Sequence, residues 1–175
     1  MDSTFDDFEV SLRDGRVVHV RAVAATDEAE LVQAFGRLSA EARYLRFMGS
    51  VGELDVERLR KAFAAFPEGG IGIVATVPAD DGIDIVGSAV YFIEPDRARC
   101  EFAIVVASGF GGAGLATTLM TALIDAAKRQ GLREMDGFVL AVNQPMLRLA
   151  KRLGFTIEPD PDDASVRVCR LRLKP

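Results

Sequence analysis

The chain has 175 residues, 49% of them hydrophobic, which is enough for one sizeable core, and no linker divides it, so we expect a single domain over residues 1–175. Its net charge of −5 argues against a nucleic-acid binder, because such proteins neutralise phosphates with surplus lysine and arginine. The N-terminus is acidic and no run reaches about 18 apolar residues, so neither a membrane protein nor an exported one is expected.

The first half of the chain predicts strands on both sides of a helical segment. Two short β-rich runs are joined by Arg13-Asp14-Gly15-Arg16, whose Asp-Gly pair is a strong hairpin signal. The expected strands are 8–12, 17–22, 71–77, 84–93 and 99–106. The expected helices are 26–38, with Thr26 as N-cap, 39–47, with Ser39 as N-cap, and 55–66. Short turns between the last three strands predict an antiparallel meander.

The second half begins with a glycine-rich loop, residues 109–114, which leads from a strand into a long amphipathic helix. The helix is expected to bury Leu115, Leu119, Leu123 and Ala126 and to stop at Gly131. The elements expected after it are strand 135–140, helix 145–152, and strands 155–158 and 166–173. This order predicts an α/β (α+β) fold with a mixed sheet and helices on its faces.

Two cysteines, Cys100 and Cys169, lie inside strand-like runs and have no metal-ligand spacing. We therefore expect buried, reduced thiols rather than a disulfide or a zinc site. Reduced thiols fit a cytoplasmic protein.

The loop and the helix after it have the layout of a phosphate cradle. Glycine lets the backbone approach an anion closely, and the free N–H groups at a helix start attract it without a basic side chain. A ligand with a pyrophosphate group is therefore expected. A glycine-rich turn without a ligand is the simplest alternative.

A dinucleotide site is a second alternative, because Gly109, Gly111 and Gly114 spell GxGxxG. Three features count against it. The loop comes after about a hundred residues that include several strands, whereas the fingerprint belongs to a first strand-turn-helix unit. The next strand ends in Ala141-Val142-Asn143 rather than in an acidic residue. Too few elements follow to complete a doubly wound sheet.

The run from Glu101 through the loop and helix, followed by residues 139–155, resembles the GNAT superfamily of acyl-CoA-dependent N-acetyltransferases. Leu38-Ser39 and Tyr44-Leu45-Arg46-Phe47 are further similar to the GNAT domain of bacterial protein lysine acetyltransferases. The resemblance implies a GNAT fold: a mixed, mostly antiparallel sheet of about seven strands, with helices on both faces. It also implies that strands four and five, here 99–106 and 135–140, splay apart to admit the pantetheine arm of acetyl-CoA.

The family loop pattern, Gln/Arg-x-x-Gly-x-Gly/Ala, aligns with residues 111–116. Gly114 and Ala116 match it, whereas Gly111 stands where glutamine or arginine is usual. That departure removes a side-chain contact near the phosphates, so weaker cofactor binding is expected. The cofactor-binding residues that the resemblance implies are Val105, Val106, Gly111, Gly112, Ala113, Gly114, Leu115, Ala116, Thr117, Asn143 and Arg148. Among them, the N–H groups of Val105 and Val106 would polarise the thioester carbonyl.

Acyl transfer to an amine also needs a base. A lysine with a reference pKa near 10.4 must lose a proton at pH 7, which costs about 4.6 kcal/mol. Glu101 is the candidate: it opens the strand before the loop, and the resemblance places there a glutamate that acts as base through water. The alternative is an exposed carboxylate or an ion-pair partner of Arg99.

Three positions in the last helix region complete the predicted site. Asn143 matches a family position near the pantetheine arm, and it also suits the N-cap of the helix after it. Arg148 could reach the 3′-phosphate of coenzyme A or lie on a solvated basic face. Many family members place a tyrosine acid where this chain has Ala150, so the general acid stays unassigned.

The sequence thus predicts an N-acetyltransferase that uses acetyl-CoA and no metal. The expected acceptor is a lysine on a protein such as an acyl-CoA synthetase. A small-molecule amine is the nearest alternative acceptor. A non-catalytic acyl-CoA sensor is a further alternative, because of Gly111 and Ala150. The chain is expected to be a monomer or a homodimer.

Overall fold

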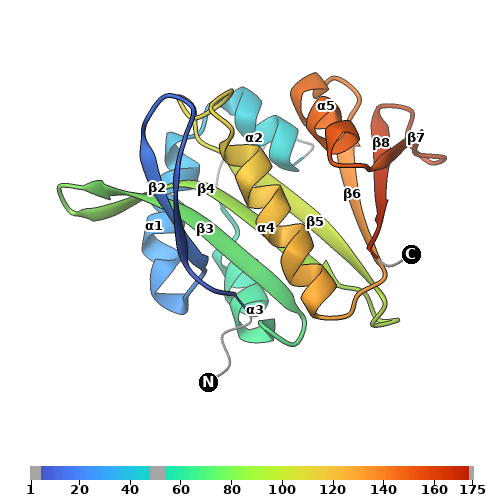
Figure 1. The fold of residues 1–175 in the computed structure, drawn as a ribbon, viewed down its shortest axis with the longest axis horizontal. Helices are drawn as coiled ribbons and strands as arrows, with labels where there is room; N and C mark the ends of the chain where they lie inside the picture. Colours follow the sequence, from blue (N-terminus) through green and yellow to red (C-terminus); the bar gives the residue numbers. More distant parts are fainter. Residues whose placement is uncertain (1–4, 48–53, 174–175) are drawn as a thin grey trace.

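Eight strands form one sheet in the computed structural model, which describes residues 5–47 and 54–173. The strands are β1 (Phe8–Ser11), β2 (Val17–Ala22), β3 (Gly70–Ala79), β4 (Gly82–Ile93), β5 (Arg99–Val106), β6 (Glu134–Leu140), β7 (Thr156–Pro159) and β8 (Val166–Arg172). Their order is β1-β2-β3-β4-β5-β6-β8-β7 (Figure 1). Only β5 and β6 pair in parallel, so the mixed, mostly antiparallel sheet is confirmed. All eight strands, including the short edge strand β7, were predicted from the sequence, whereas the family resemblance implied about seven.

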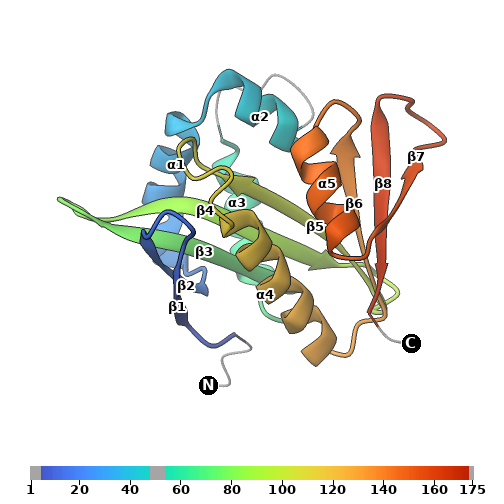
Figure 2. The same cartoon turned by 45° about the horizontal axis from the view of Figure 1, so that its top comes forward.

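Helices cover both faces of this sheet, as predicted. They are α1 (Glu28–Arg37), α2 (Ala40–Phe47), α3 (Val56–Ala65), α4 (Leu115–Arg129) and α5 (Gln144–Arg152). Figures 1 and 2 show α4 crossing the face of β3, β4 and β5 that is opposite to α1 and α3. Within the described residues, none of the helices has the length and apolar character needed to span a membrane.

Ser39 caps α2 as predicted, and Asp55, which was predicted only as the start of a helix, caps α3. The Ser39 hydroxyl accepts a hydrogen bond from Ala42 N–H at 3.0 Å, and Asp55 accepts one from Arg58 N–H at 3.1 Å. The prediction that Thr26 caps the first helix is wrong, because α1 begins at Glu28 after a short 3₁₀ turn. That turn is held by Asp27, whose carboxylate accepts from Ala24 N–H and from Arg21, each at 2.8 Å.

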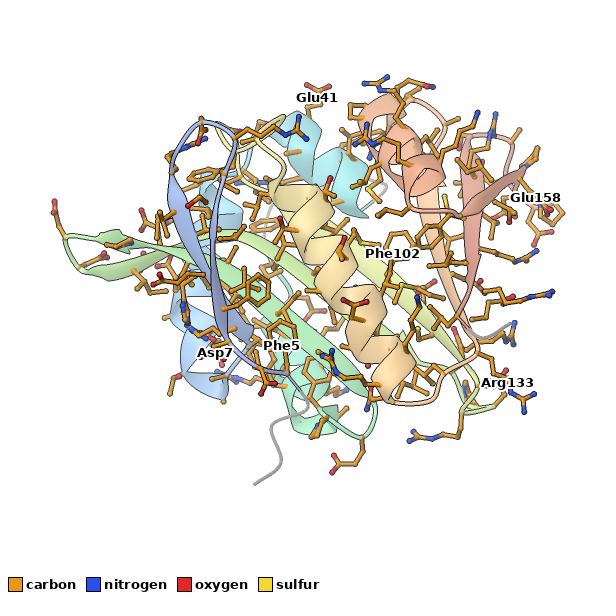
Figure 3. All side chains as sticks on the ribbon, in the orientation of Figure 1. Phe5, Asp7, Glu41, Phe102, Arg133 and Glu158 are labelled. Carbon is orange, nitrogen blue, oxygen red and sulfur yellow. The ribbon has the colours of Figure 1, made fainter. Side chains whose placement is uncertain are left out.

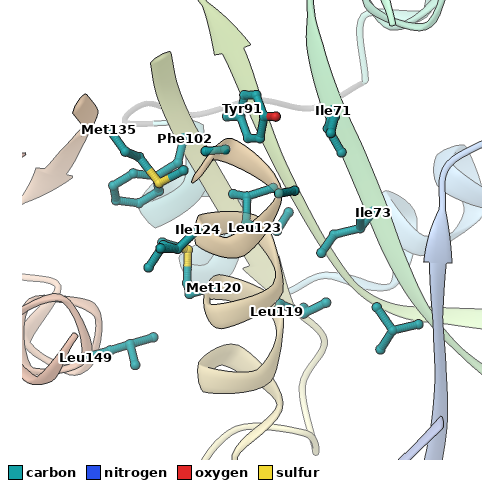
Figure 4. Close-up of a cluster of buried hydrophobic side chains, with 14 of the residues drawn as sticks. Ile71, Ile73, Tyr91, Phe102, Leu119, Met120, Leu123, Ile124, Met135 and Leu149 are labelled. Carbon is teal, nitrogen blue, oxygen red and sulfur yellow. The ribbon is translucent and has the colours of Figure 1, made fainter. Parts of the chain in front are cut away.

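The core lies between α4 and the sheet. The predicted stripe of Leu115, Leu119, Leu123 and Ala126 is almost wholly buried. Figure 4 shows Leu119 and Leu123 of α4 facing Ile73 of β3, within the buried cluster that the sheet and α4 share. Cys100 and Cys169 are buried free thiols, as predicted. Burial of this kind fixes α4, and with it the loop at its start, against the middle of the sheet.

The sheet opens between β5 and β6. These strands pair only over Arg99–Glu134, Cys100–Met135 and Glu101–Asp136, whereas β5 continues along β4 and β6 along β8. The divergence is visible in Figures 1 and 2 and confirms the predicted splay.

Phe102 occupies the point where the two strands separate. Its ring lies against Gly137 of β6, where an added methyl group would be 2.1 Å from the ring atom Cε1. Figure 3 shows Phe102 beside α4, on the side of β6. The ring also packs edge-on against Phe155, with the two ring centroids 5.3 Å apart. We call this opening the fork.

Candidate active site

The glycine-rich loop of residues 109–114 connects the open end of β5 to the start of α4. Gly114 is the N-cap residue and has φ +94°, a left-handed conformation that residues with a Cβ rarely adopt. The N–H groups of residues 111–117 make no main-chain hydrogen bond of standard geometry within the described part of the chain. A methyl group added to Gly109, Gly111 or Gly112 would meet no atom within 4 Å. The loop therefore offers a row of unsatisfied donors next to open space, and this arrangement fits a pyrophosphate.

The turn between β1 and β2 packs against this loop. Arg13 N–H donates to the carbonyl of Ala113 at 3.1 Å, and the Arg16 guanidinium donates to the carbonyl of Gly109 at 2.6 Å. The Arg16 guanidinium also lies 3.9 Å from the centre of the Phe110 ring. Asp14 pairs with Arg16 and holds it in place. The loop conformation is thus supported by residues about a hundred positions earlier.

A cavity of about 130 Å³ lies in the fork; we call it the fork cavity. Its walls come from β5, β6, α2 and the start of α5, and they include Glu101, Phe138, Asn143 and Met146. Phe138 is 43% exposed, which is high for a phenylalanine in a strand and leaves an apolar surface for a ligand. The fork cavity therefore suits a narrow, mostly apolar chain such as a pantetheine arm.

A second cavity, of about 840 Å³, lies between the sheet and the helices α1 and α3; we call it the helix-side cavity. Its lining is mainly aliphatic and aromatic, with Arg58 and Lys61 of α3 among the charged residues. The two cavities share four lining residues: Arg46, Glu101, Phe102 and Ala103. Glu101 is therefore a wall of both spaces.

The Glu101 carboxylate is half-buried, and its surroundings perturb its ionisation. Burial raises its pKa above the ordinary value, and the charge of Glu94 raises it further, whereas the Arg46 guanidinium acts in the opposite direction. Arg99 does not pair with Glu101, because its guanidinium donates to Asp96 at 2.8 Å. A carboxylate with a raised pKa in a cleft is suited to accept a proton.

Main-chain direction distinguishes the two valines proposed to face the thioester. Ala107 N–H donates to the Val86 carbonyl of β4, while the Ala98 carbonyl accepts from Arg133 on the side of β6. Because N–H directions alternate along a strand, Val105 N–H points toward β4 and Val106 N–H points toward the fork. Val106 is thus the one of the pair with a donor free for a substrate.

The remaining predicted residues lie around α5 and at the start of α4. Asn143 lines the fork cavity, and it also caps α5 by accepting from Met146 N–H at 3.4 Å, which confirms the predicted N-cap. Arg148 is exposed on α5 and lines neither cavity. Leu115 is buried, and Ala116 and Thr117 belong to the first turn of α4. Ala150 is wholly buried.

Sequence reasoning missed two residues at the fork. Arg46 of α2 lines both cavities beside Glu101, but the sequence run that contains it, Tyr44-Leu45-Arg46-Phe47, assigned it no role at the site. Asp136 lies directly opposite Glu101 in the β5–β6 pairing, and burial raises its pKa to about 6. No local sequence signal links either side chain to Glu101, because only the folded structure brings them next to it.

Within the described residues, no group of three or more histidine, cysteine, aspartate or glutamate side chains is arranged to hold a metal ion. The sheet also has a single parallel pair, whereas a dinucleotide fold requires a doubly wound parallel sheet. A splayed mixed sheet, a donor-rich loop at a helix start and a carboxylate between two cavities together define an acyl-CoA-dependent acyltransferase.

Comparison with known proteins agrees with that class. Residues 39–155 match the acetyltransferase (GNAT) family, so the chain belongs to this family and is an N-acetyltransferase. An acetyltransferase of Pseudomonas aeruginosa is 34% identical over 168 residues, which are 96% of this chain and 90% of that protein. Acetyl-CoA is the co-substrate that family membership supports.

Solved structures show the same fold. The GNAT domain of S. lividans PAT superposes with a TM-score of 0.85 at 21% identity, covering 95% of this chain and 96% of that one. The structure of yncA from Salmonella typhimurium, which holds its cofactor acetyl-CoA, superposes with a TM-score of 0.68 at 20% identity. That match covers 90% of this chain and 95% of yncA.

Proposed function

We propose that this acetyltransferase moves an acetyl group from acetyl-CoA to a primary amine by direct attack, and that the amine is a lysine side chain of a protein. The observation that carries the proposal is the position of Glu101 on the wall shared by the fork cavity and the helix-side cavity. The resemblance of Leu38-Ser39 and residues 44–47 to protein lysine acetyltransferases supports the choice of lysine.

The donor would be held along the fork. The unsatisfied N–H groups of residues 111–117 would bind the pyrophosphate, and the apolar walls at Phe138 and Met146 would cover the pantetheine arm. Asn143 lines the same cavity and can donate its amide to the arm. The Val106 N–H would polarise the thioester carbonyl, because it points into the fork.

The acceptor amine would enter from the helix-side cavity. Its apolar lining disfavours an ammonium ion, so it lowers the cost of presenting a neutral amine. Glu101 accepts the proton through a water molecule as the nitrogen bonds to the acetyl carbon and the carbon–sulfur bond breaks. The thiol of coenzyme A has a pKa near that of free cysteine, so water can protonate the leaving thiolate. No side-chain acid is therefore required at the position of Ala150.

A small-molecule amine is the second candidate acceptor. The helix-side cavity, at about 840 Å³, falls in the size range of small-molecule sites, and its lining is mainly apolar. An apolar amine would bury more of its surface there than the narrow side chain of a lysine.

The test is release of free thiol from acetyl-CoA in the presence of three acceptor sets: lysine peptides, a folded acyl-CoA synthetase, and a panel of polyamines and arylalkylamines. Glu101→Gln preserves shape and should lower kcat about 100-fold or more, because it removes the base. Its affinity for acetyl-CoA, measured by calorimetry, should stay close to that of the wild type.

The outcomes separate the alternatives. Faster turnover with the apolar amines than with any lysine would refute the lysine assignment. Tight acetyl-CoA binding with no thiol release in any set would favour the sensor. Normal turnover by Glu101→Gln would remove Glu101 as the base.

A further inference from the structure

The loop lacks the cationic or amide side chain that its family pattern places at position 111. Gly111 carries no side chain, and a methyl group there would meet nothing within 4 Å, so no neighbour fills the space. A pyrophosphate carries two negative charges, and hydrogen bonds from charged donors are about twice as strong as those from neutral amides. The loop therefore has the geometry for a pyrophosphate but no cation of its own.

A cation reaches the loop from the β1–β2 turn instead. Arg13 follows the end of β1, and its main-chain N–H is fixed to the Ala113 carbonyl at 3.1 Å. Its guanidinium lies beside the N-cap residue of α4: a methyl group on Gly114 would be 3.5 Å from Nε and 3.7 Å from Nη2 of Arg13. Arg13 is exposed, so its guanidinium is accessible to a ligand at the open side of the loop.

The two arginines of this turn differ in their partners. Arg16 pairs with Asp14 and donates to the carbonyl of Gly109, so its role is to support the loop. The Arg13 guanidinium makes no hydrogen bond or ion pair within residues 5–47 and 54–173. A helix start carries partial positive charge, so an unneutralised cation beside it is unfavourable unless an anion binds between them.

We propose that Arg13 binds the pyrophosphate of coenzyme A and supplies from the β1–β2 turn the charged contact that Gly111 lacks. This inference rests on the proposed use of acetyl-CoA. It adds a side-chain donor from a different part of the chain to the main-chain donors of residues 111–117. Arginine suits the task, because its planar fork of N–H donors matches the oxygens of a phosphate.

The test measures binding directly, by titration calorimetry with coenzyme A and with desulfo-coenzyme A. Arg13→Ala keeps the main-chain bond to Ala113 and should weaken binding about tenfold or more, as expected for loss of a charge-assisted contact. Arg172→Ala, which changes an exposed arginine on β8, is the matched control and should leave binding unchanged. The affinity of the Arg13→Ala protein should also depend less on salt concentration.

Two further measurements separate a ligand contact from a structural role. The KM for acetyl-pantetheine, which has no pyrophosphate, should be the same in Arg13→Ala and in the wild type. Adding Gly111→Arg to Arg13→Ala should restore most of the affinity, because φ at Gly111 is not in the left-handed region and the space is open.

Each outcome has one meaning. If the wild type fails to bind coenzyme A, the proposed function fails, and this inference fails with it. If the wild type binds and Arg13→Ala binds equally well, only the role of Arg13 is refuted. Equal weakening toward coenzyme A and acetyl-pantetheine would also refute it, because the defect would then lie in the loop structure.

Discussion

Substitution of Gly137 by alanine tests whether Phe102 holds β5 and β6 apart. The added methyl group would lie 2.1 Å from Cε1 and 2.3 Å from Cζ of Phe102, well inside the 3.4–4 Å of ordinary van der Waals contact. The ring has little room to move, because it is only 5% exposed and packs on Phe155. Overpacking of this kind costs about 1–3 kcal/mol. For a chain of this length, Tm should fall by roughly 2–12 °C.

The assay is thermal unfolding followed by circular dichroism, in a double-mutant cycle with Phe102→Leu. Leucine lacks the ring atoms that the new methyl group meets, so the double variant should be less destabilised than the sum of the two single changes. Phe102 also lines both cavities, so Gly137→Ala should weaken acetyl-CoA binding as well. This account of the fork would be contradicted if Gly137→Ala had the same Tm as the wild type. It would also be contradicted if the destabilisation of the double variant equalled the sum for the two single variants.

Charge changes around Glu101 should move the acid limb of the kcat/KM profile in opposite directions. Glu94→Gln removes a like charge, so it lowers the pKa of Glu101 and moves the acid limb to lower pH. Arg46→Met removes the opposing cation, so it raises the pKa of Glu101 and moves the acid limb to higher pH. Shifts of the limb in the same direction in both variants would disprove Glu101 as the titrating base. Asp27→Asn should cost about 2–3 kcal/mol of unfolding free energy, between the values for exposed and fully buried pairs, because it breaks the Arg21 ion pair. Burial acts to raise the pKa of Asp27, but the hydrogen bonds from Arg21 and Ala24 outweigh it and the net pKa is lowered. The Tm difference between wild type and Asp27→Asn should therefore be constant above about pH 5 and narrow below about pH 4; a constant difference down to pH 2 would contradict this.

Local patterns were sufficient for most of the fold. The hairpin at Asp14-Gly15, the apolar stripe on α4 and the cap at Asn143 each depend on neighbours within a few residues, and the structure has all three. The start of α1 was misplaced because Asp27 is held by Arg21, a contact that a cap pattern does not include. Residue propensity identifies which residue types can cap a helix. Here the ion pair between Asp27 and Arg21, which joins the turn to β2, decides where the helix begins.

The site was less accessible to sequence reasoning. Glu101 and the loop lie on one continuous stretch, so their positions followed from a strand and a helix start. Arg13 and Arg46 come from segments far away in the sequence, and nothing near either residue indicates its contact with the loop or with Glu101. The distinction between Val105 and Val106 required the hydrogen-bond direction of β5, which depends on its pairing with β4.

Because one carboxylate forms part of the wall of both cavities, donor and acceptor can occupy the protein together without competing for the same volume. Turnover should then pass through a ternary complex, giving intersecting rather than parallel lines in double-reciprocal plots. A single molecule that joins coenzyme A to an amine through an acetyl-length bridge would fill both spaces at once. Its affinity would gain from the high effective concentration of each half for its own cavity.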